Sequence, residues 1–205
     1  MGNGDMATTK PAEDSLEKIA AEVRGCPLCK LARTRKNAVP GEGQLAAKIM
    51  FVGEAPGRSE DEKGRPFVGA AGRILDDMLK KAGIERSEVF ITNVVKCRPP
   101  GNRVPEEDEA AACRPYLDRQ IALIRPRVIC ILGRTAYSSL LGGSSITANR
   151  GKIVEKTGQK YFLTIHPAAA IYNRSLLSVL EADLKKLAKE IKDKKESKSS
   201  LEDYL

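Results

Sequence analysis

The sequence predicts an α/β fold of three layers (αβα), in which helices cover both faces of a central, mostly parallel four-stranded sheet. Four short apolar runs have the composition of strands buried on both faces, at residues 49–52, 89–95, 127–133 and 161–165. Segments with apolar residues at helical spacing lie between these runs. Strands that alternate with helices along the chain are typical of a parallel sheet between two helical layers.

The apolar spacing predicts five main helices. Their expected ranges are 13–24, 69–83, 106–124, 135–141 and 176–191. Proline removes a backbone donor and clashes with the preceding turn, so we expect an interruption near Pro115. The turn Glu60-Asp61-Glu62 is expected to be an acidic turn outside these helices.

Length and charge limit the organisation and the partners of the chain. With 205 residues, the chain supports one sizeable core, and we expect a single domain over 13–192. The polar segment 1–12 is expected to be disordered, and 193–205 to form a flexible basic tail. The formal charge of +8 predicts attraction to polyanions such as nucleic acid, although part of the excess lies in the tail.

The chain shows no sign of a membrane segment. No apolar run is long enough to cross a bilayer, and the first residues lack the apolar core of a signal peptide. We therefore expect a cytoplasmic protein with no membrane partner, and we expect it to be a monomer.

Polar residues follow the predicted strands. In a parallel sheet the carboxyl ends of the strands share one edge, where ligands bind. The residues at these ends are Glu54, Asn93, Gly133 with Arg134, and His166, and we expect them to meet in one crevice. Taken alone, Glu54 before the turn Ala55-Pro56-Gly57 is equally consistent with a plain β-turn and a solvated carboxylate.

The cysteine pattern predicts a metal centre. Cys26 and Cys29 form a CxxC, and Cys97 and Cys113 supply a second, widely spaced pair. Four thiolates suit either tetrahedral zinc or a [4Fe-4S] cluster, and spacing alone does not separate them. Pro27 inside the CxxC and a fourth ligand on a helix favour iron and sulfur in a structural role. Cys130, inside an apolar run, is expected in the core.

Four motifs, together with the four cysteines in this order, resemble the family 4 uracil-DNA glycosylases, the iron–sulfur type. These motifs are GEAPG at 53–57, GRPFVGAAG at 64–72, TNVVKCRPP at 92–100 and HPAA at 166–169. The resemblance covers roughly residues 13–190. Covalent uracil-DNA-binding relatives carry a basic, histidine-containing insertion after the second strand. This chain has only a short segment there, and its single histidine is His166, which favours turnover over covalent trapping.

The resemblance implies a monofunctional DNA glycosylase that flips uracil out of DNA, hydrolyses its N-glycosidic bond and starts base excision repair. It implies catalytic roles for Glu54 and His166. It places the substrate pocket at Glu54, Ala55, Pro56, Glu60, Phe67, Asn93 and His166, with Glu60 near uracil C5. The residue types agree, because Phe67 offers a stacking plane and Asn93 can both donate to and accept from a base edge.

The resemblance also implies contacts with uracil-containing DNA and a nucleoid-associated location. Backbone contacts are expected at Gly57, Gly133, Arg134, Arg150 and Gly151. The loop after the histidine offers Ile171 or Tyr172 as a wedge, followed by Arg174. Near the C-terminus, Leu201, Tyr204 and Leu205 have the spacing of a sliding-clamp-binding peptide, although a disordered basic end explains them more simply.

Two other classes of protein fit parts of the pattern. One is a non-catalytic or covalent uracil-DNA or nucleic-acid-binding protein with a structural metal centre, such as zinc. The other is an α/β electron-transfer protein that uses the cluster and does not need Glu54 or His166.

Overall fold

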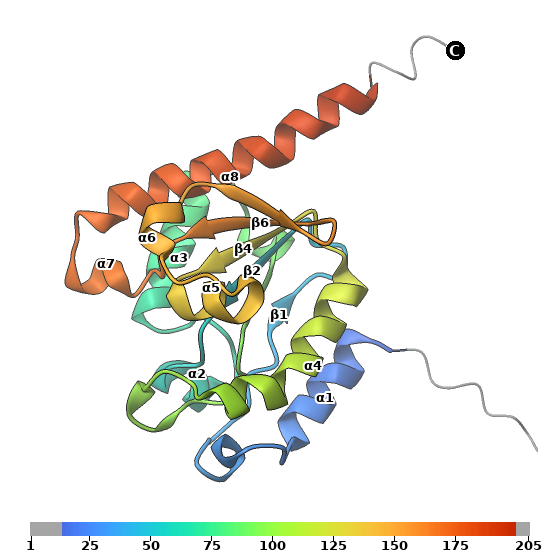
Figure 1. Ribbon diagram of the computed structural model, residues 1–205, viewed down its shortest axis with the longest axis vertical. Coiled ribbons are helices and arrows are strands. Elements are labelled where there is room, and N and C mark those ends of the chain that lie inside the picture. The colour runs from blue at the N-terminus through green and yellow to red at the C-terminus, as the bar shows by residue number, and fades with distance from the viewer. Residues whose placement is uncertain (1–13, 200–205) are drawn as a thin grey trace, which may run out of the picture.

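The computed structural model describes residues 14–199, with side chains through residue 191. A six-stranded sheet of order β1-β3-β2-β4-β6-β5 runs through its centre (Figure 1). The four central strands are parallel, namely β3 (Phe90–Asn93), β2 (Ile49–Gly53), β4 (Val128–Leu132) and β6 (Gln159–Thr164). The predicted mostly parallel sheet is confirmed.

Two antiparallel edge strands were not predicted. β1 (Glu42–Gly43) pairs with β3, and β5 (Ile153–Lys156) pairs with β6. β1 is only two residues long, and β5 is half-exposed with the sequence IVEK, so neither strand forms an apolar run.

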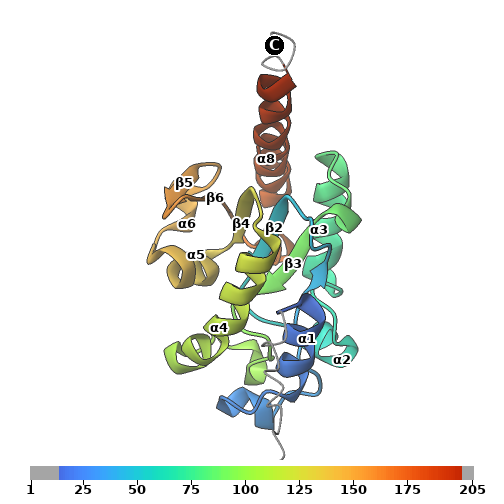
Figure 2. The same cartoon turned by 90° about the vertical axis from the view of Figure 1, so that its right-hand side faces the viewer.

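Helices cover both faces of the sheet (Figure 2). α3 (Ala70–Lys81) and α8 (Leu176–Ser199) pack on one face, whereas α1 (Leu16–Gly25), α4 (Glu107–Ile124) and α5 (Arg134–Leu141) pack on the other. Alternate residues of β2 explain why both faces are apolar: Met50 and Val52 join one core, while Ile49 and Phe51 join the other. The three predicted layers are therefore present.

The long helices differ from the prediction at two points. The expected interruption near Pro115 is wrong, because α4 continues through it. Buried Cys113, Tyr116 and Leu117 anchor the helix on both sides of the proline, and this packing outweighs one lost backbone hydrogen bond. α8 continues to Ser199, into the segment expected to be a flexible tail. The segment 1–12 and the clamp-like residues Leu201, Tyr204 and Leu205 lie outside the described residues.

Short helical turns complete the connections. The α-helical turns are α2 (Arg58–Lys63), α6 (Ile146–Asn149) and α7 (Ala169–Tyr172). The 3-10 turns are η1 (Lys30–Arg33), η2 (Arg86–Glu88) and η3 (Pro100–Asn102). The expected acidic turn at Glu60 is thus part of α2. Within residues 14–199, no helix is long and apolar enough to cross a membrane.

Candidate active site and cysteine centre

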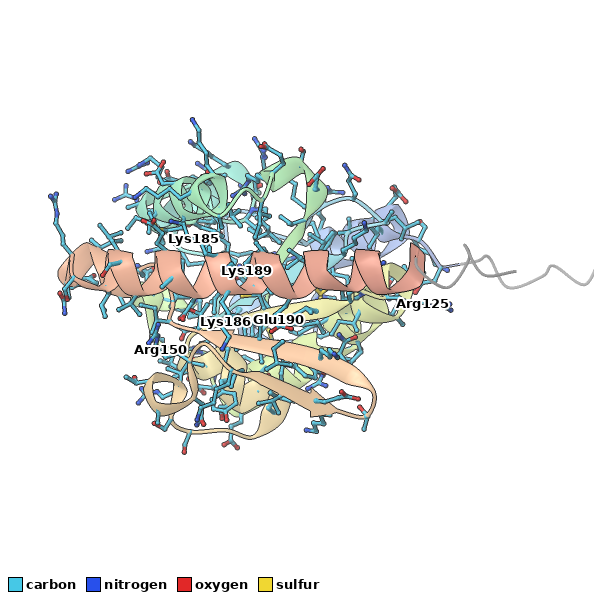
Figure 3. The ribbon with its side chains drawn as sticks, turned by 90° about the horizontal axis from the view of Figure 1, so that it is seen from above. Arg125, Arg150, Lys185, Lys186, Lys189 and Glu190 are labelled. Carbon is cyan, nitrogen blue, oxygen red and sulfur yellow. The ribbon has the colours of Figure 1, made fainter. Side chains whose placement is uncertain are left out.

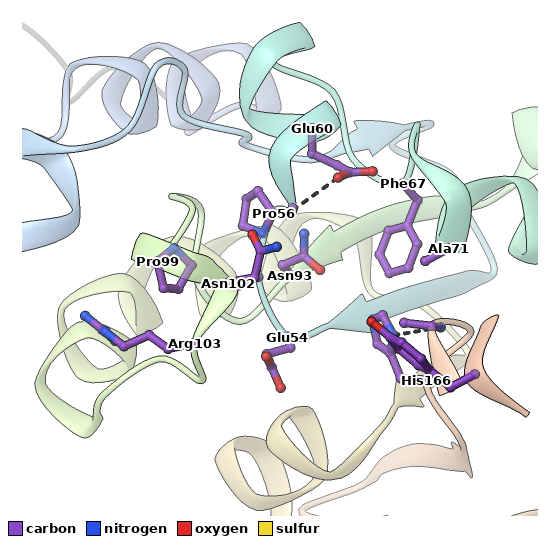
Figure 4. Close-up of a pocket in the computed structure, with 14 residues that line it drawn as sticks. Glu54, Pro56, Glu60, Phe67, Ala71, Asn93, Pro99, Asn102, Arg103 and His166 are labelled. Carbon is purple, nitrogen blue, oxygen red and sulfur yellow. Dashed lines mark hydrogen bonds between the residues drawn. The ribbon is translucent and has the colours of Figure 1, made fainter. Parts of the chain in front are cut away.

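A pocket of about 390 Å³ opens at the carboxyl ends of β2, β3 and β6 (Figure 4). All seven expected substrate and catalytic residues line it, together with residues of α3, of the segment 99–103 and of the α7 region. The lining is Glu54, Ala55, Pro56, Gly57, Glu60, Phe67, Ala71, Asn93, Pro99, Asn102, Arg103, His166, Ala168 and Tyr172. The fold therefore brings together the strand ends that carry Glu54, Asn93 and His166.

Gly53, the last residue of β2, has no side chain, and this leaves room for the side chains of Asn93 and Phe67. A Cβ at this position would lie 2.5 Å from Asn93 Oδ1 and 2.7 Å from Phe67 Cζ, which is closer than atoms can pack. Asn93 is buried, and its Oδ1 is the one buried side-chain polar atom in the described part of the chain that has no hydrogen-bond partner. A buried amide oxygen without a partner costs free energy, so this atom is prepared for a donor from a ligand.

The Phe67 loop is held by the carboxylate of Glu60. Phe67 is buried and adopts a positive φ of 50°, which is uncommon for a bulky side chain. The backbone N–H groups of Val68 and Gly69 donate to Glu60 Oε1 at 2.8 and 2.7 Å, and that of Gly57 donates to Oε2 at 3.2 Å. Glu60 thus lines the pocket and also fixes the ring that forms its wall.

His166 is held as a neutral imidazole. Its ring lies 5.7 Å from that of Phe67, and its Nδ1 accepts a hydrogen bond from the Ala168 N–H at 3.2 Å (Figure 4). Because Nδ1 accepts, the proton of the neutral ring is on Nε2. Burial lowers the pKa of His166 to about 4, with a smaller opposing effect from the charge of Glu60. The ring is therefore uncharged at neutral pH and offers one N–H donor.

Gly133 lets the end of β4 approach His166. Its φ is +92°, and a Cβ there would lie 2.9 Å from His166 Cβ. The Gly133 N–H donates to the carbonyl of Thr164 at 2.9 Å, which joins the ends of β4 and β6. The contacts of this glycine therefore position the histidine.

Glu54 has a partner that the sequence did not reveal. The hydroxyl of Thr135, in the first turn of α5, donates to Glu54 Oε2. The N-terminal end of a helix also stabilises a nearby negative charge. The sequence alone did not single out Ala71, Pro99, Asn102, Arg103, Ala168 or Thr135 as site residues. Ala71, Pro99 and Ala168 do lie inside the quoted motifs, whereas no motif marks Asn102, Arg103 or Thr135.

The expected DNA-contacting residues fall into two groups. Ile171 and Tyr172 on α7 are 46% and 90% exposed, and Arg134 and Arg174 are also exposed. In contrast, Arg150 binds Asp183 of α8 at 2.6 and 3.0 Å. The Gly151 N–H donates to the carbonyl of Leu163, and its own carbonyl accepts from Lys186. The contacts of the Arg150-Gly151 turn are thus internal.

The four expected cysteine ligands line one small cavity beside α1 and α4. Arg35 donates to Cys97 Sγ at 3.1 Å, and the Lys96 N–H donates to Cys113 Sγ at 3.2 Å. Burial raises the pKa of Cys113 to about 11, so this thiol needs a cation to become a thiolate. Cys130 is fully buried in β4, away from this group, as its apolar setting predicted.

The arrangement of the four cysteines bears on which group they could hold. Among the described residues, no group of three or more His, Cys, Asp or Glu side chains is arranged to hold one. A single tetrahedral zinc needs sulfurs only about 3.8 Å apart, because each Zn–S bond is about 2.3 Å. A [4Fe-4S] cluster is also held by four thiolates. The all-cysteine lining, with N–H donors to two of the sulfurs, suits thiolate ligands of either kind.

A buried lysine joins this cavity to the pocket. The Lys96 ammonium donates to Thr92 Oγ1, to the Asn93 carbonyl and to Gln120 Oε1 at 2.6, 3.0 and 2.8 Å. Its backbone N–H contacts Cys113, so one residue touches both the cysteine group and the backbone of Asn93. The sequence analysis did not identify Lys96.

The fold and the pocket agree with a known family. The model of the Uracil DNA glycosylase superfamily matches residues 40–192, a range that contains every residue of the pocket. The chain belongs to this superfamily.

Individual relatives define the group within it. A protein from Sulfurisphaera tokodaii named Type-4 uracil-DNA glycosylase is 60% identical over 184 residues, which cover 85% of this chain and 84% of the relative. One of the same name from Archaeoglobus fulgidus is 46% identical, covering 94% of this chain and all of the relative. A Type-5 uracil-DNA glycosylase from Pyrobaculum aerophilum is 31% identical over 69% of this chain. The chain groups with the type-4 proteins, and the resemblance in its motifs is confirmed.

Proposed function

We propose that the pocket receives a uracil base extruded from DNA and that the chain hydrolyses its N-glycosidic bond, as a monofunctional glycosylase that starts base excision repair. The observation that carries the proposal is the buried, unpartnered Asn93 Oδ1 in a pocket that also contains Glu54, Phe67 and His166. Membership of the superfamily and the names of the type-4 relatives support the same activity.

The pocket recognises uracil by stacking and by hydrogen bonds. Phe67 supplies the ring against which the base stacks, worth about 1–3 kcal/mol per base. In the orientation of the structure, Asn93 Oδ1 accepts from uracil N3–H and its amide donates to O4. Cytosine presents a lone pair at N3 and a donor at the place of O4, so this orientation rejects it. Glu60, beside the base, limits the room at C5 for the methyl group of thymine.

Bond cleavage separates charge between sugar and base. As the C1′–N1 bond breaks, the electron pair moves to uracil and the sugar becomes a cation. The neutral His166 donates from Nε2 to uracil O2 and stabilises the leaving anion. The carboxylate of Glu54 stabilises the cation and orients the water that attacks C1′. The products are free uracil and DNA with an abasic sugar.

The four cysteines Cys26, Cys29, Cys97 and Cys113 hold a [4Fe-4S] cluster in this proposal. Such a cluster supplies structural cross-linking of distant segments when bound, and no reaction step depends on it. The cavity that all four line and the N–H donors to Cys97 and Cys113 support this assignment. Cross-linking at this point steadies the loop that contributes Pro99, Asn102 and Arg103 to the pocket.

Contacts with DNA surround the pocket mouth. Arg134, Ile171, Tyr172 and Arg174 are exposed and contact the strand, with Ile171 or Tyr172 filling the space that the base leaves. The backbone of Gly57 at the pocket also contacts it. The internal contacts of Gly133, Arg150 and Gly151 support structural roles instead. A monomeric state, a cytoplasmic, nucleoid-associated location and binding of the C-terminal tail to a sliding clamp complete the proposal.

The direct test is incubation with single- and double-stranded oligonucleotides that contain uracil, hypoxanthine or a thymine mismatch, followed by alkaline cleavage. We expect cleavage at uracil and none at thymine. Single-turnover release of uracil should fall strongly in Glu54→Ala and in His166→Ala, whereas Lys189→Ala, on the exposed side of α8, serves as control. Uracil release at unchanged rates in both catalytic variants would refute the assigned roles.

A further inference from the structure

A second hollow, larger than the pocket, lies between α3, α7 and the start of α8. Its volume is about 940 Å³, compared with about 390 Å³ for the pocket. We call it the α3–α7 groove. Apolar side chains from all three helices form part of its lining: Ile74, Met78, Ile171 and Leu177.

The groove and the pocket share two walls. In the first turn of α3, Ala70 lines the groove and Ala71 lines the pocket. On α7, Ile171 lines the groove, whereas its neighbour Tyr172 lines the pocket. α3 and α7 also pack against each other. A polymeric ligand that extends out of the pocket therefore needs to cross only the short helix α7 to enter the groove.

Positive charge surrounds the apolar lining. Arg73, Lys80 and Arg174 line the groove, are exposed, and make no hydrogen bond or ion pair within the described residues. Lys81 also lines it but is paired with Glu181 at 3.0 Å. Asp77 is the only acidic residue in the lining. Three cations without a partner among the described residues, around an apolar lining that is partly exposed, suit a polyanion that also carries flat apolar groups.

We propose that the α3–α7 groove binds the single-stranded DNA segment next to the uridine held in the pocket. This inference rests on the proposed function and adds a substrate preference to it. In a single strand, phosphates can meet Arg73, Lys80 and Arg174 while unstacked bases lie on Ile74, Ile171 and Leu177. Duplex DNA presents phosphates and keeps its bases stacked, so it would leave the apolar lining unused.

The test compares substrates that fill the groove with substrates that do not. The rate kcat/KM of uracil release is measured on three single strands: one with uracil in the middle, and two in which either the 5′ or the 3′ side is cut to one nucleotide. The double variant Arg73→Glu/Lys80→Glu changes the groove without touching the pocket residues. The control is Lys189→Glu, a charge reversal at an exposed site on α8 (Figure 3). At the rise of an α-helix, this site is about 18 Å along the helix from Leu177.

The expected result has three parts. Trimming one side lowers kcat/KM about tenfold or more, and the double variant lowers kcat/KM on the long strand by a similar factor. On the strand trimmed on that side, the double variant has the same kcat/KM as the wild type. On every strand, kcat at saturating substrate is also the same. The slope of log kcat/KM against log salt becomes shallower by about 1.4, because each phosphate contact with single-stranded DNA contributes about 0.7.

Other outcomes overturn the inference. An equal loss on long and trimmed strands, no dependence on length, or the same loss in Lys189→Glu would show that the groove does not bind the flanking segment. An equal loss on duplex substrates would make the groove a phosphate contact for duplex DNA. These results would leave the proposed function intact, whereas an absence of uracil release from every substrate would refute that function and this inference with it.

Discussion

The hydroxyl of Thr135 donates a hydrogen bond to a carboxylate oxygen of Glu54, across 81 positions of sequence. Thr135 lies in the first turn of α5, which follows β4, and Glu54 directly follows β2. Because β2 and β4 are neighbouring strands, the contact joins the two segments that leave their carboxyl ends. One carboxylate oxygen is thereby held, and its orientation sets where the other points. In the proposed mechanism, Thr135 acts through Glu54 and is a positioning residue.

Thr135→Val should therefore lower the rate of uracil release. The change removes the donor and keeps the shape, and a hydrogen bond to a charged group is worth about 1.5–3 kcal/mol, or about 10- to 100-fold in rate. We expect the loss in single-turnover rate, with little change in KM. Thr135→Ser keeps the hydroxyl and should retain most of the rate. Equal losses in both variants would show that the hydrogen bond does not carry the effect, because Thr135→Ser keeps the hydroxyl.

His166 should titrate near pH 4 in the folded protein. Burial lowers its pKa, so the ring is neutral above this pH. The chain has one histidine, which allows nitrogen NMR to follow this ring alone. We expect a proton on Nε2 and none on Nδ1 at pH 7. The urea-unfolded chain should titrate near its ordinary value of about 6.5, and the same value in the folded protein would contradict the neutral-donor role.

The same shift makes stability depend on pH. The folded pKa lies below the unfolded one, so between about pH 6.5 and 4 the unfolded chain binds more protons at His166. The free energy of unfolding should therefore fall as the pH is lowered through this window. His166→Gln should weaken the dependence there, which urea titrations at several pH values can measure.

Gly53→Ala should disturb the pocket more than the fold elsewhere. Its Cβ would overlap Asn93 Oδ1 and Phe67 Cζ, and such overpacking costs about 1–3 kcal/mol. We expect a lower Tm and a large loss of uracil release, because both displaced residues contact the base in the proposed mechanism. Gly25→Ala is the control, since a Cβ there has no neighbour within 4 Å. Full activity of Gly53→Ala would show that Asn93 and Phe67 are not placed as described.

Cys97→Ala should abolish the proposed cluster. We expect loss of visible absorption, of bound iron and of sulfide, together with a lower Tm, because the three segments that carry the four cysteines lose their cross-link. Cys130→Ala should keep the iron and sulfide of the wild type and cost about 1 kcal/mol of stability, since Cys130 is buried in β4 away from the other four. Zinc without iron in the purified wild type would refute the cluster.

Local patterns predicted the sheet because buried strands need apolar residues on both faces. The runs containing Phe51, Ile91, Ile131 and Leu163 therefore appear in the sequence itself. Edge strands do not carry this requirement, and β1 and β5 were missed for that reason. Pro115 was misjudged because the packing of α4, which a local rule does not include, holds the helix together.

The sequence by itself determined which polar residues end the strands, because the residue after a buried run must lie at the edge of the sheet. That rule places Glu54 and His166 at the edge, whereas Asn93 lies inside the apolar run 89–95, and the structure ends β3 at this residue. Only the tertiary structure decided their partners: Thr135 for Glu54, the Ala168 N–H for His166, and no partner for Asn93 Oδ1. The physical reason is that a side-chain hydrogen bond requires atoms within about 3 Å, and the distance between remote segments is set by the packing of the whole sheet and its helices.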